Sequence, residues 1–211
     1  DVLTTMPDNI SYEEAAPVNG SAITVMNFLK GLGNIQKNQK VLINGASGGL
    51  GTYAVQLAKH FGAEVTGVCS TNNVALVKSL GADYVIDYTQ EDFTKNGQQY
   101  DLIFDTVGKS SFSACKNSLT QTGVYLSAVL NFTLFVQMIW TSIFGSKKVK
   151  SSATGMLPVQ ERLNYFMELK ELLKTAKIKT VIDVSYPLLQ VAEAHQYVEK
   201  GHKKGSVVIS V

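Results

Sequence analysis

A single stretch near residue 45 most limits how this chain can fold: an apolar run, a cluster of glycines and the start of a helix. Residues 41–43 are Val-Leu-Ile, which predicts a buried strand. The segment Gly45–Gly51 contains four glycines, and apolar residues then recur at helical spacing over 52–61. Such a turn holds a pyrophosphate well, because the backbone comes close to the ligand and the first helical N–H groups point at it. We therefore predict a nucleotide-binding turn, with a purely structural turn as the alternative.

Strand-like and helix-like segments alternate after this turn. Apolar runs rich in β-branched residues predict five further strands, at residues 64–69, 84–88, 101–105, 123–127 and 149–153. Helical patterns fall between them at 112–119 and at 73–80, where Gly81 should end the helix. This alternation predicts an α/β fold, a Rossmann-type doubly wound parallel sheet of six strands in the order 3-2-1-4-5-6.

The segments on either side of this set have patterns of their own. Ser11 and Glu14 have the spacing of a capping box, so a helix should begin there, and a second apolar helix is expected over 22–32. Toward the other end we expect a helix over 158–176, a strand over 180–184, a helix over 188–198 and a strand over 205–211. Because that last strand follows a complete six-stranded set, we expect it to pair in a different sheet.

Composition excludes several kinds of partner. The formal net charge is +2, and the lysine clusters at 147–150 and 200–204 carry no interleaved aromatic residues, which indicates solvated faces rather than a nucleic-acid surface. Two cysteines cannot form a disulfide framework and no signal peptide opens the chain, so we expect a cytoplasmic protein. Two distant cysteines and three scattered histidines do not match the ligand sets of zinc sites, so no metal is expected.

Residues 129–144 form an apolar, aromatic-rich stretch that is too short and too often interrupted to span a bilayer. A helix packed in the core is one interpretation. A subunit interface or a mobile cover over a cleft is the other, and we favour it because the polar interruptions, at Asn131, Thr133, Gln137 and Thr141, fit poorly in a sealed core. A homodimer is a further expectation from this stretch.

Eight short stretches occur in a fixed order over nearly the whole chain: Glu14–Pro17, Gly45–Gly51, Ala54–Lys59, Leu80–Asp83, Val85–Tyr88, Asp105–Gly108, Ala194–His195 and Gly201–Gly205. Together they resemble the cofactor domain of the medium-chain dehydrogenase/reductase superfamily, in its zinc-independent quinone oxidoreductase (zeta-crystallin-like) branch. The resemblance implies three parts. Residues 1–16 would be the remnant of an N-terminal catalytic domain, 17–180 the dinucleotide-binding domain, and 181–211 a segment that packs on the catalytic domain.

The expected cofactor is NADP(H), with NAD(H) less favoured. In NAD-preferring sites an acidic residue at the end of the second strand binds the ribose 2′-hydroxyl, but here that position holds no carboxylate. Ser70, Thr71 and Asn73 follow the strand and can donate hydrogen bonds to a 2′-phosphate, although Ser70 and Thr71 could instead cap the next helix. The lysine or arginine that many members of the branch carry near Asn72 or Asn73 is missing here.

Further cofactor contacts follow from the resemblance and from strand ends. The resemblance places Tyr88 beside the adenosine phosphate and Thr24 on the nicotinamide side; an ordinary strand tyrosine and a polar residue inside a helix are the alternatives. Thr106, Val107 and Ser127 end strands at the edge where ligands bind in open α/β sheets. The full candidate set is Thr24, Ala46, Ser47, Gly48, Gly49, Leu50, Ser70, Thr71, Asn73, Tyr88, Thr106, Val107 and Ser127.

The resemblance implies an NADPH-dependent oxidoreductase that passes hydride to a small electrophile, such as a quinone, an enone or a related carbonyl compound. No catalytic residue is assigned, since such groups would lie on the N-terminal domain, and this chain should bind cofactor but turn over weakly. The alternatives are a non-enzymatic NADPH-binding sensor or a crystallin-like module. A short-chain reductase shares the glycine pattern, but no tyrosine here has the lysine four residues later that those enzymes use.

Overall fold

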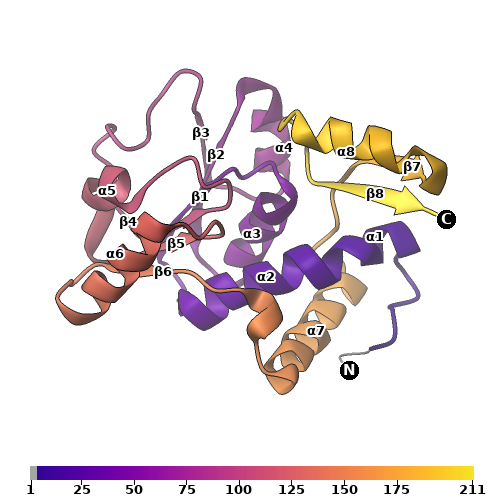
Figure 1. Cartoon of the computed structure of the whole chain (residues 1–211), viewed down its shortest axis with the longest axis horizontal. Coiled ribbons are helices and arrows are strands. Elements are labelled where there is room, and N and C mark those ends of the chain that lie inside the picture. Colours follow the sequence, from indigo (N-terminus) through magenta and orange to yellow (C-terminus); the bar gives the residue numbers. More distant parts are fainter. Residues whose placement is uncertain (1–3) are drawn as a thin grey trace.

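A computed structural model of the chain describes residues 4–211 and contains a six-stranded parallel sheet (Figure 1). Its order is β3-β2-β1-β4-β5-β6, and every neighbouring pair is parallel. The strands are β1 (Lys40–Asn44), β2 (Glu64–Cys69), β3 (Tyr84–Asp87), β4 (Tyr100–Asp105), β5 (Leu119–Ser127) and β6 (Lys148–Lys150). The predicted fold class and strand order are confirmed.

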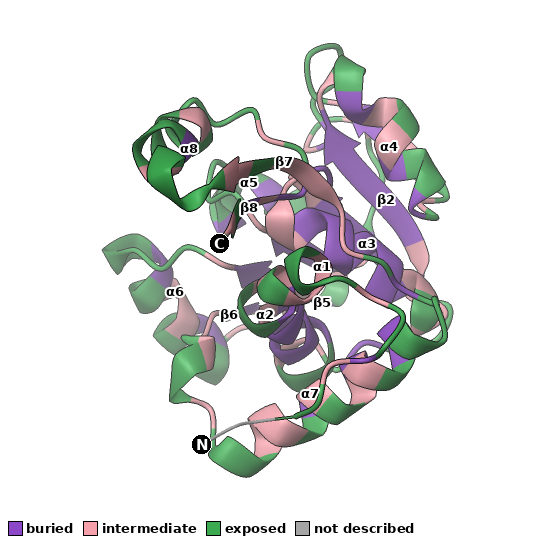
Figure 2. Ribbon diagram, turned by 90° about the vertical axis from the view of Figure 1, so that its right-hand side faces the viewer, coloured by how far each residue is buried: buried purple, intermediate pink, exposed green. Residues whose placement is uncertain are grey.

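Helices cover both faces of this sheet, because side chains alternate along each strand. Val41 and Ile43 of β1 pack in one core with the residue 18–29 helices, α3 (Gly49–His60), α4 (Val74–Ser79) and α7 (Val159–Lys174). Leu42, between them, packs in the other core with α5 (Phe112–Cys115) and α6 (Phe132–Ile143). Figure 2 shows β2 and much of α3 buried, while α6 and α8 expose most of their residues. Short 3-10 turns complete these connections: η3 (Thr71–Asn73), η4 (Lys116–Ser118) and η5 (Thr154–Met156).

The N-terminal helix begins at the predicted capping box. The Ser11 hydroxyl accepts from the Glu14 N–H at 3.1 Å, and the Glu14 carboxylate accepts from the Ser11 N–H at 2.8 Å. The two helices expected here are, however, one unbroken helical run of alternating α and π turns: α1 (Tyr12–Pro17), η1 (Val18–Ala22), α2 (Ile23–Met26) and η2 (Asn27–Leu32). Pro17 lacks an N–H, and the chain widens into a π turn directly after it instead of ending the helix.

The C-terminal strands form a second sheet, as expected for the last strand. β7 (Ile182–Pro187) and β8 (Ser206–Ser210) pair in parallel, joined by η6 (Leu188–Gln190) and α8 (Val191–Glu199). The strand predicted over 180–184 begins two residues later and ends three residues later than expected. This two-stranded unit packs against α1 and reaches the glycine-rich turn through Gly205, which forms a parallel bridge with Gly48.

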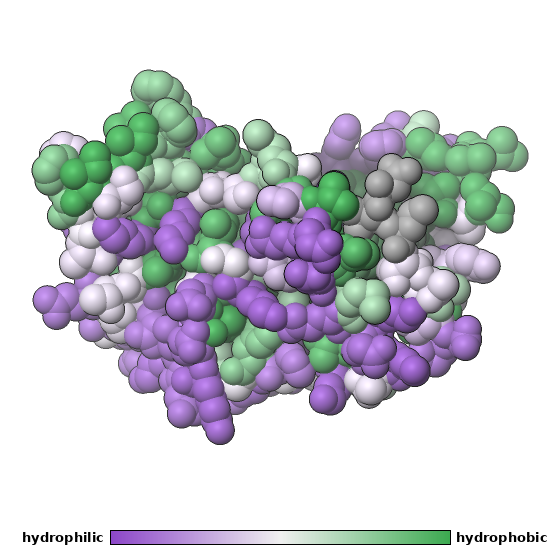
Figure 3. Space-filling view, turned by 90° about the horizontal axis from the view of Figure 1, so that it is seen from below, coloured by the Kyte–Doolittle hydropathy of each residue, from purple (hydrophilic) through white to green (hydrophobic). Residues whose placement is uncertain are grey.

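Helix α6 lies on the outside of the molecule, packed on β6. Within the apolar stretch 129–144, Leu134 and Thr141 are buried, while Phe132, Trp140 and Phe144 are 82%, 65% and 70% exposed. Figure 3 shows hydrophobic side chains gathered at the left-hand end of the molecule, where α6 lies. The interpretation of the stretch as a helix sealed in the core is therefore wrong.

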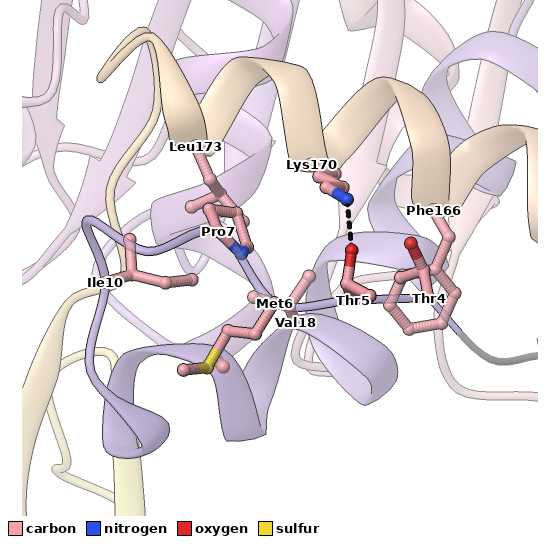
Figure 4. Close-up of a pocket in the computed structure, with 10 residues that line it drawn as sticks. Thr4, Thr5, Met6, Pro7, Ile10, Val18, Phe166, Lys170 and Leu173 are labelled. Carbon is pink, nitrogen blue, oxygen red and sulfur yellow. Dashed lines mark hydrogen bonds between the residues drawn. The ribbon is translucent and has the colours of Figure 1, made fainter.

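Residues 4–10 lie along α7 and surround a small, mostly apolar cavity of about 130 Å³ (Figure 4). Lys170 donates to the Thr5 hydroxyl at 2.6 Å, and the Asn9 amide donates to the Leu173 and Lys174 carbonyls, both at 3.3 Å. These polar contacts fix the segment before the first helix to the body of the domain.

Candidate dinucleotide-binding site

The glycine-rich turn joins β1 to α3 and is closed by its own backbone. The Gly45 and Ala46 N–H groups both donate to the Val68 carbonyl of β2, at 3.1 and 2.9 Å, and the Gly48 N–H donates to the Gly45 carbonyl at 3.1 Å. Gly45 has φ +83°, a conformation that glycine adopts without strain. The turn is therefore determined by β1 and β2 together.

Two of the glycines are required because no side chain fits beside them. A Cβ on Gly51 would lie 2.0 Å from the Gly45 carbonyl oxygen, and one on Gly45 would lie 2.2 Å from Val107 Cγ2. Gly48 is different, since its nearest neighbour would be 3.5 Å away, and it begins α3 with no side-chain cap. The first N–H groups of α3 thus have no side-chain acceptor at Gly48, which is the arrangement that binds an anion at a helix N-terminus.

Lys203 brings a cation from the far end of the chain to this turn. Its ammonium donates to the Gly205 carbonyl at 2.7 Å and would lie 3.1 Å from a Cβ on Gly49, while the Gly205 N–H donates to the Ser47 carbonyl at 2.7 Å. Burial lowers the pKa of Lys203 below the usual lysine value. A cavity of about 430 Å³ opens here between the α1–η1 run and β8, with Gly49 and Lys203 in its wall.

Lys203 is not among the residues predicted for the site, and the 200–204 lysines are predicted to form a solvated face. That assignment is wrong for Lys203, which is half-buried, because the β7–β8 unit folds back onto the turn. The stretch Gly201–Gly205 already stood out by its resemblance, and a cation within it was the feature that could have led to this residue.

Asn73 reaches back from the segment after β2 to the glycine-rich turn. Its amide nitrogen donates to the Ser47 hydroxyl at 3.0 Å and to the Ser70 hydroxyl at 3.2 Å. The side chain is only 8% exposed, and its buried Oδ1 has no hydrogen-bond partner among the described residues. The amide donors expected for a 2′-phosphate are therefore engaged, and the atom left over is an acceptor, which suits a hydroxyl group such as that of a ribose.

A carboxylate that the sequence analysis did not consider lies at the same edge. Asp87 ends β3, in register with Cys69 at the end of β2, and accepts from the Thr71 hydroxyl at 2.5 Å. Thr89 and Gln90 also donate to it, and these hydrogen bonds, that of Thr71 first, lower the pKa of Asp87. The proton of Thr71 therefore points to a carboxylate. Because parallel neighbours end at one edge of the sheet, the position of Asp87 at the end of β3 is the sequence signal for this carboxylate.

Tyr88 follows Asp87 and keeps its side chain 58% exposed, while its N–H donates to the Cys69 carbonyl at 3.0 Å. The tyrosine therefore lies at the same edge of the sheet as Ser70 and Thr71, and its contact with the adenosine phosphate stays a prediction. Ala46 and Ser47 are buried within the turn, and Leu50 is half-buried in the first turn of α3.

The strand-end residues of β4 and β5 surround a buried carboxylate, Asp105. Five groups donate to it at 3.0–3.1 Å: the Asn44 amide, the Tyr125 hydroxyl and the N–H groups of Val107, Gly108 and Ser110. Burial and the nearby carboxylate raise the pKa of Tyr125, which therefore stays protonated as a donor. Asp105 thereby fixes the loop that carries Thr106 and Val107.

Three candidate hydroxyls bind backbone carbonyls. Thr106 donates to the Asn44 carbonyl at 2.8 Å, Ser127 to the Val129 carbonyl at 2.9 Å, and Thr24 to the Gly20 carbonyl one helical turn earlier at 2.6 Å. Thr106 follows Asp105 at the carboxyl end of β4, and Ser127, which ends β5, is in register with Asp105. Thr24 lies on α2, which packs against α3, and it makes the bond that a polar residue inside a helix ordinarily makes.

Within residues 4–211, no group of three His, Cys, Asp or Glu side chains is placed to hold a metal ion. Cys69 and Cys115 are both buried, and burial raises the pKa of each thiol to about 11, so they remain protonated. Over the same part of the chain, each helix is either too short or too polar to cross a membrane.

A parallel sheet of this order, with a glycine-rich turn where the strand order reverses, defines a Rossmann-type dinucleotide-binding domain. Residues 80–209 match the family described as zinc-binding dehydrogenase, and the chain belongs to that family. The resemblance to quinone oxidoreductases is confirmed by the individual relatives.

The mouse (Mus musculus) mitochondrial NAD(P)H oxidoreductase RTN4IP1 is 34% identical over 97% of this chain and 57% of its own length. The Arabidopsis thaliana chloroplast envelope quinone oxidoreductase homolog is 30% identical over 96% of this chain and 63% of its own. The structure of Escherichia coli quinone oxidoreductase complexed with NADPH superposes with a TM-score of 0.83 at 25% identity, covering 98% of this chain and 68% of that one. The chain thus spans about three fifths of the curated relatives.

The expected cytoplasmic location is wrong, since these relatives are named mitochondrial and chloroplast proteins. The expectation rested on cysteine usage and on the absence of a signal peptide. Neither property distinguishes the cytoplasm from a mitochondrion or a chloroplast, because targeting segments are separate from the fold.

We expect Lys203 to make anion binding at the turn dependent on pH. A bound pyrophosphate favours the ammonium form and raises its pKa, so affinity should fall as pH rises through the lowered pKa of the free protein. We expect Lys203→Gln to weaken NADPH binding by roughly tenfold at neutral pH and to flatten this dependence. Lys204→Gln, at the exposed neighbouring lysine, is the control. Calorimetric titrations from neutral to alkaline pH measure both effects, and equal behaviour of the two variants would contradict the role of Lys203.

Proposed function

We propose that this chain holds NADPH for an oxidoreductase that passes hydride to a quinone, an enone or a related carbonyl compound. The observation that carries the proposal is the closed turn Gly45–Gly51, at which Lys203 stands. The names of the relatives support the reaction class: an NAD(P)H oxidoreductase, a quinone oxidoreductase homolog, and a quinone oxidoreductase complexed with NADPH.

The residues present fit a dinucleotide. The N-terminus of α3 and Lys203 would hold the pyrophosphate, and the unpaired Asn73 Oδ1 would accept from a ribose hydroxyl. Ala46–Leu50 would form the floor of the site, with Ser70, Thr71 and Tyr88 near the adenosine ribose and Thr24, Thr106, Val107 and Ser127 toward the nicotinamide. The cofactor supplies hydride transfer, while these residues bind and orient it.

We further propose a role for each part of the chain. Residues 17–180 would bind the dinucleotide, and residues 1–16 and 181–211 would contact a catalytic domain elsewhere in the whole protein, since the relatives are longer than this chain. The groups that bind the electrophile would then lie outside this chain. Oxidation of NADPH by a quinone or an enone in the whole protein tests the reaction itself, and its complete absence would contradict the proposed activity.

The preference for NADPH over NADH should be modest, because Asp87 faces Thr71 at the edge that would receive a 2′-phosphate. Asp87→Asn should raise NADPH affinity roughly fivefold while leaving NADH affinity nearly unchanged, since the removed charge repels only the phosphate. Asp92→Asn is a matched control, because Asp92 also accepts from the N–H and hydroxyl of a threonine two residues later.

Calorimetric titration of each variant with both dinucleotides measures these affinities. Failure of the unmodified chain to bind either one would contradict the proposed binding function. Binding of both with no change in Asp87→Asn would instead contradict only the position assigned to the 2′-phosphate.

A further inference from the structure

Two buried side chains of α3 hold the segment that leads from α7 to β7 (Figure 1). Gln56 pairs with the backbone of Lys179: its amide group donates to the Lys179 carbonyl at 3.0 Å and accepts from the Lys179 N–H at 2.9 Å. Tyr53, three residues earlier on α3, lies 2.6 Å from the Thr180 hydroxyl through its own hydroxyl. The Gln56 and Tyr53 side chains are 7% and 1% exposed. The chain is therefore bonded to the middle of α3 two residues before β7 begins.

The Tyr53 hydroxyl is the donor in its bond with Thr180. The single hydroxyl hydrogen of Thr180 is donated to the Glu14 carbonyl of α1 at 2.6 Å, which leaves the Thr180 oxygen as an acceptor. Burial raises the pKa of Tyr53 to about 12, so the phenol keeps its proton. Through this one hydroxyl of Thr180, α3 holds both α1 and the segment before β7.

The next residue of the chain, Val181, contacts the loop that carries Lys203. The Val181 carbonyl accepts from the Ser206 N–H at 2.8 Å, and a Cβ on Gly205 would lie 2.2 Å from that same oxygen. Gly205 in turn donates to the Ser47 carbonyl and accepts from the Lys203 ammonium, both at 2.7 Å. The contacts thus close a ring that begins on α3 and ends on the turn before it, through Tyr53, Thr180, Val181, Gly205 and Ser47.

The loop that carries Lys203 is also bonded to β7. The Asp183 carboxylate of β7 accepts from the Lys204 N–H at 2.9 Å and from the Tyr197 hydroxyl of α8 at 2.7 Å. β8 begins directly after the loop and pairs with β7. The loop contains two glycines with positive φ, so its own sequence restrains it little. The position of Lys203 is therefore set by the position of β7, which α3 holds.

We propose that Tyr53 is a positioning residue which, through Thr180, holds the Lys203 ammonium at the glycine-rich turn. The inference rests on the proposed function, because it concerns how the site for the dinucleotide receives its cation. A lysine side chain has several rotatable bonds, and fixing its place before the anion arrives lowers the cost of binding. One helix would then act twice on the pyrophosphate, since the first N–H groups of α3 face the anion and Tyr53, one turn later, fixes the cation.

Hydrogen exchange in the ligand-free chain tests the placement itself. Tyr53→Phe removes the hydroxyl and keeps the ring, so we expect the amides of Gly205 and Ser206 to exchange roughly fivefold faster, since one buried hydrogen bond no longer opposes local opening. Tyr165→Phe is the matched control. Tyr165 is also buried with a pKa raised to about 12, but its hydroxyl donates to Glu161 of its own helix, and the two amides should keep their rates.

Two substitutions at Thr180 separate its hydroxyl from the size of its side chain. Thr180→Val keeps the branched shape and removes the hydroxyl, so it should accelerate exchange of the same two amides at least as much as Tyr53→Phe does. It also leaves the Tyr53 hydroxyl buried without an acceptor. Thr180→Ser keeps the hydroxyl and should exchange like the unmodified chain.

Calorimetry with NADPH tests whether Tyr53 acts through Lys203. Tyr53→Phe alone should weaken NADPH binding roughly threefold, because the ammonium is at the turn in a smaller fraction of molecules. In a chain that already carries Lys203→Gln, the same change should have no further effect, since no cation is left to place. A purely structural role of Tyr53 would instead make the two losses of affinity multiply.

Three results would overturn the proposal. The first is unchanged exchange of the Gly205 and Ser206 amides in Tyr53→Phe, and the second is the same acceleration in Tyr165→Phe. The third is a loss of NADPH affinity in the double variant that equals the product of the two single losses. An unmodified chain that does not bind NADPH would contradict the proposed function, while the exchange rates would still decide whether Tyr53 places the loop that carries Lys203.

Discussion

Replacing Gly51 with valine should eliminate NADPH binding and lower the free energy of unfolding by about 3 kcal/mol or more. The new Cβ would lie 2.0 Å from the Gly45 carbonyl oxygen and 2.7 Å from Ala46 backbone atoms. Backbone cannot move aside as a flexible side chain can, so the turn must open. Opening it displaces the Gly45 and Ala46 N–H groups from the Val68 carbonyl, and with them the start of α3.

Urea unfolding followed by circular dichroism measures the stability loss, and calorimetry with NADPH measures binding. Gly155→Val is the matched control, because a Cβ there meets no atom within 4 Å and its φ is not positive. That substitution should change stability by less than about 1 kcal/mol and leave the affinity intact. A Gly51→Val chain with unaltered stability and NADPH binding would show that the turn does not hold the dinucleotide.

Asp105→Asn should destabilise the fold by about 3 kcal/mol, the second largest effect we expect. The carboxylate is fully buried and accepts five hydrogen bonds from groups on β1, on β5 and in the loop after β4. An amide turns an NH₂ group toward donors, so at least one buried donor loses its acceptor and the charge-assisted character of the remaining bonds is lost. The loop carrying Thr106 and Val107 should loosen with it.

The comparison for this variant is Asp101→Asn at the other end of the same strand. Asp101 is only half-buried and accepts from the Lys40 N–H at 2.9 Å and the Thr120 hydroxyl at 3.1 Å. Its replacement should lower the free energy of unfolding by about 1 kcal/mol. The urea midpoints of the two variants measure this difference in stability. Equal midpoints would mean that Asp105 contributes no more to the stability of the fold than Asp101 does.

Sequence reasoning recovers the sheet because its determinants are local. Runs such as Val41–Ile43 and Glu64–Cys69 carry β-branched residues over the length of a strand, and a glycine lies two residues after the first run, at Gly45, and two residues before the second, at Gly62. Parallel pairing then follows from the intervening helices. The residues Ala46–Leu50 are predicted for the same reason, since strand, turn and helix are contiguous in the chain.

What the sequence alone could not supply depends on segments that are distant in the chain. Lys203 lies more than 150 residues after the turn that it faces, and Asp87 reaches Thr71 only because β2 and β3 are neighbours. Periodicity identifies the apolar side of α6 but not whether that side faces the sheet or the surroundings. The continuity of the 12–32 helical run through Pro17 likewise depends on packing against α3 and α7.

The contact between Gly205 and Ser47 makes the C-terminal unit and the nucleotide turn thermodynamically coupled. Any ligand that stabilises the turn must also stabilise the docked position of β7 and β8, because one hydrogen bond and one lysine belong to both. By the reciprocity of linkage, a partner that stabilises the docked position of β7 and β8 strengthens ligand binding. A partner that stabilises their undocked position weakens it. Binding of a partner to the last strand can therefore change the affinity of the turn for its ligand.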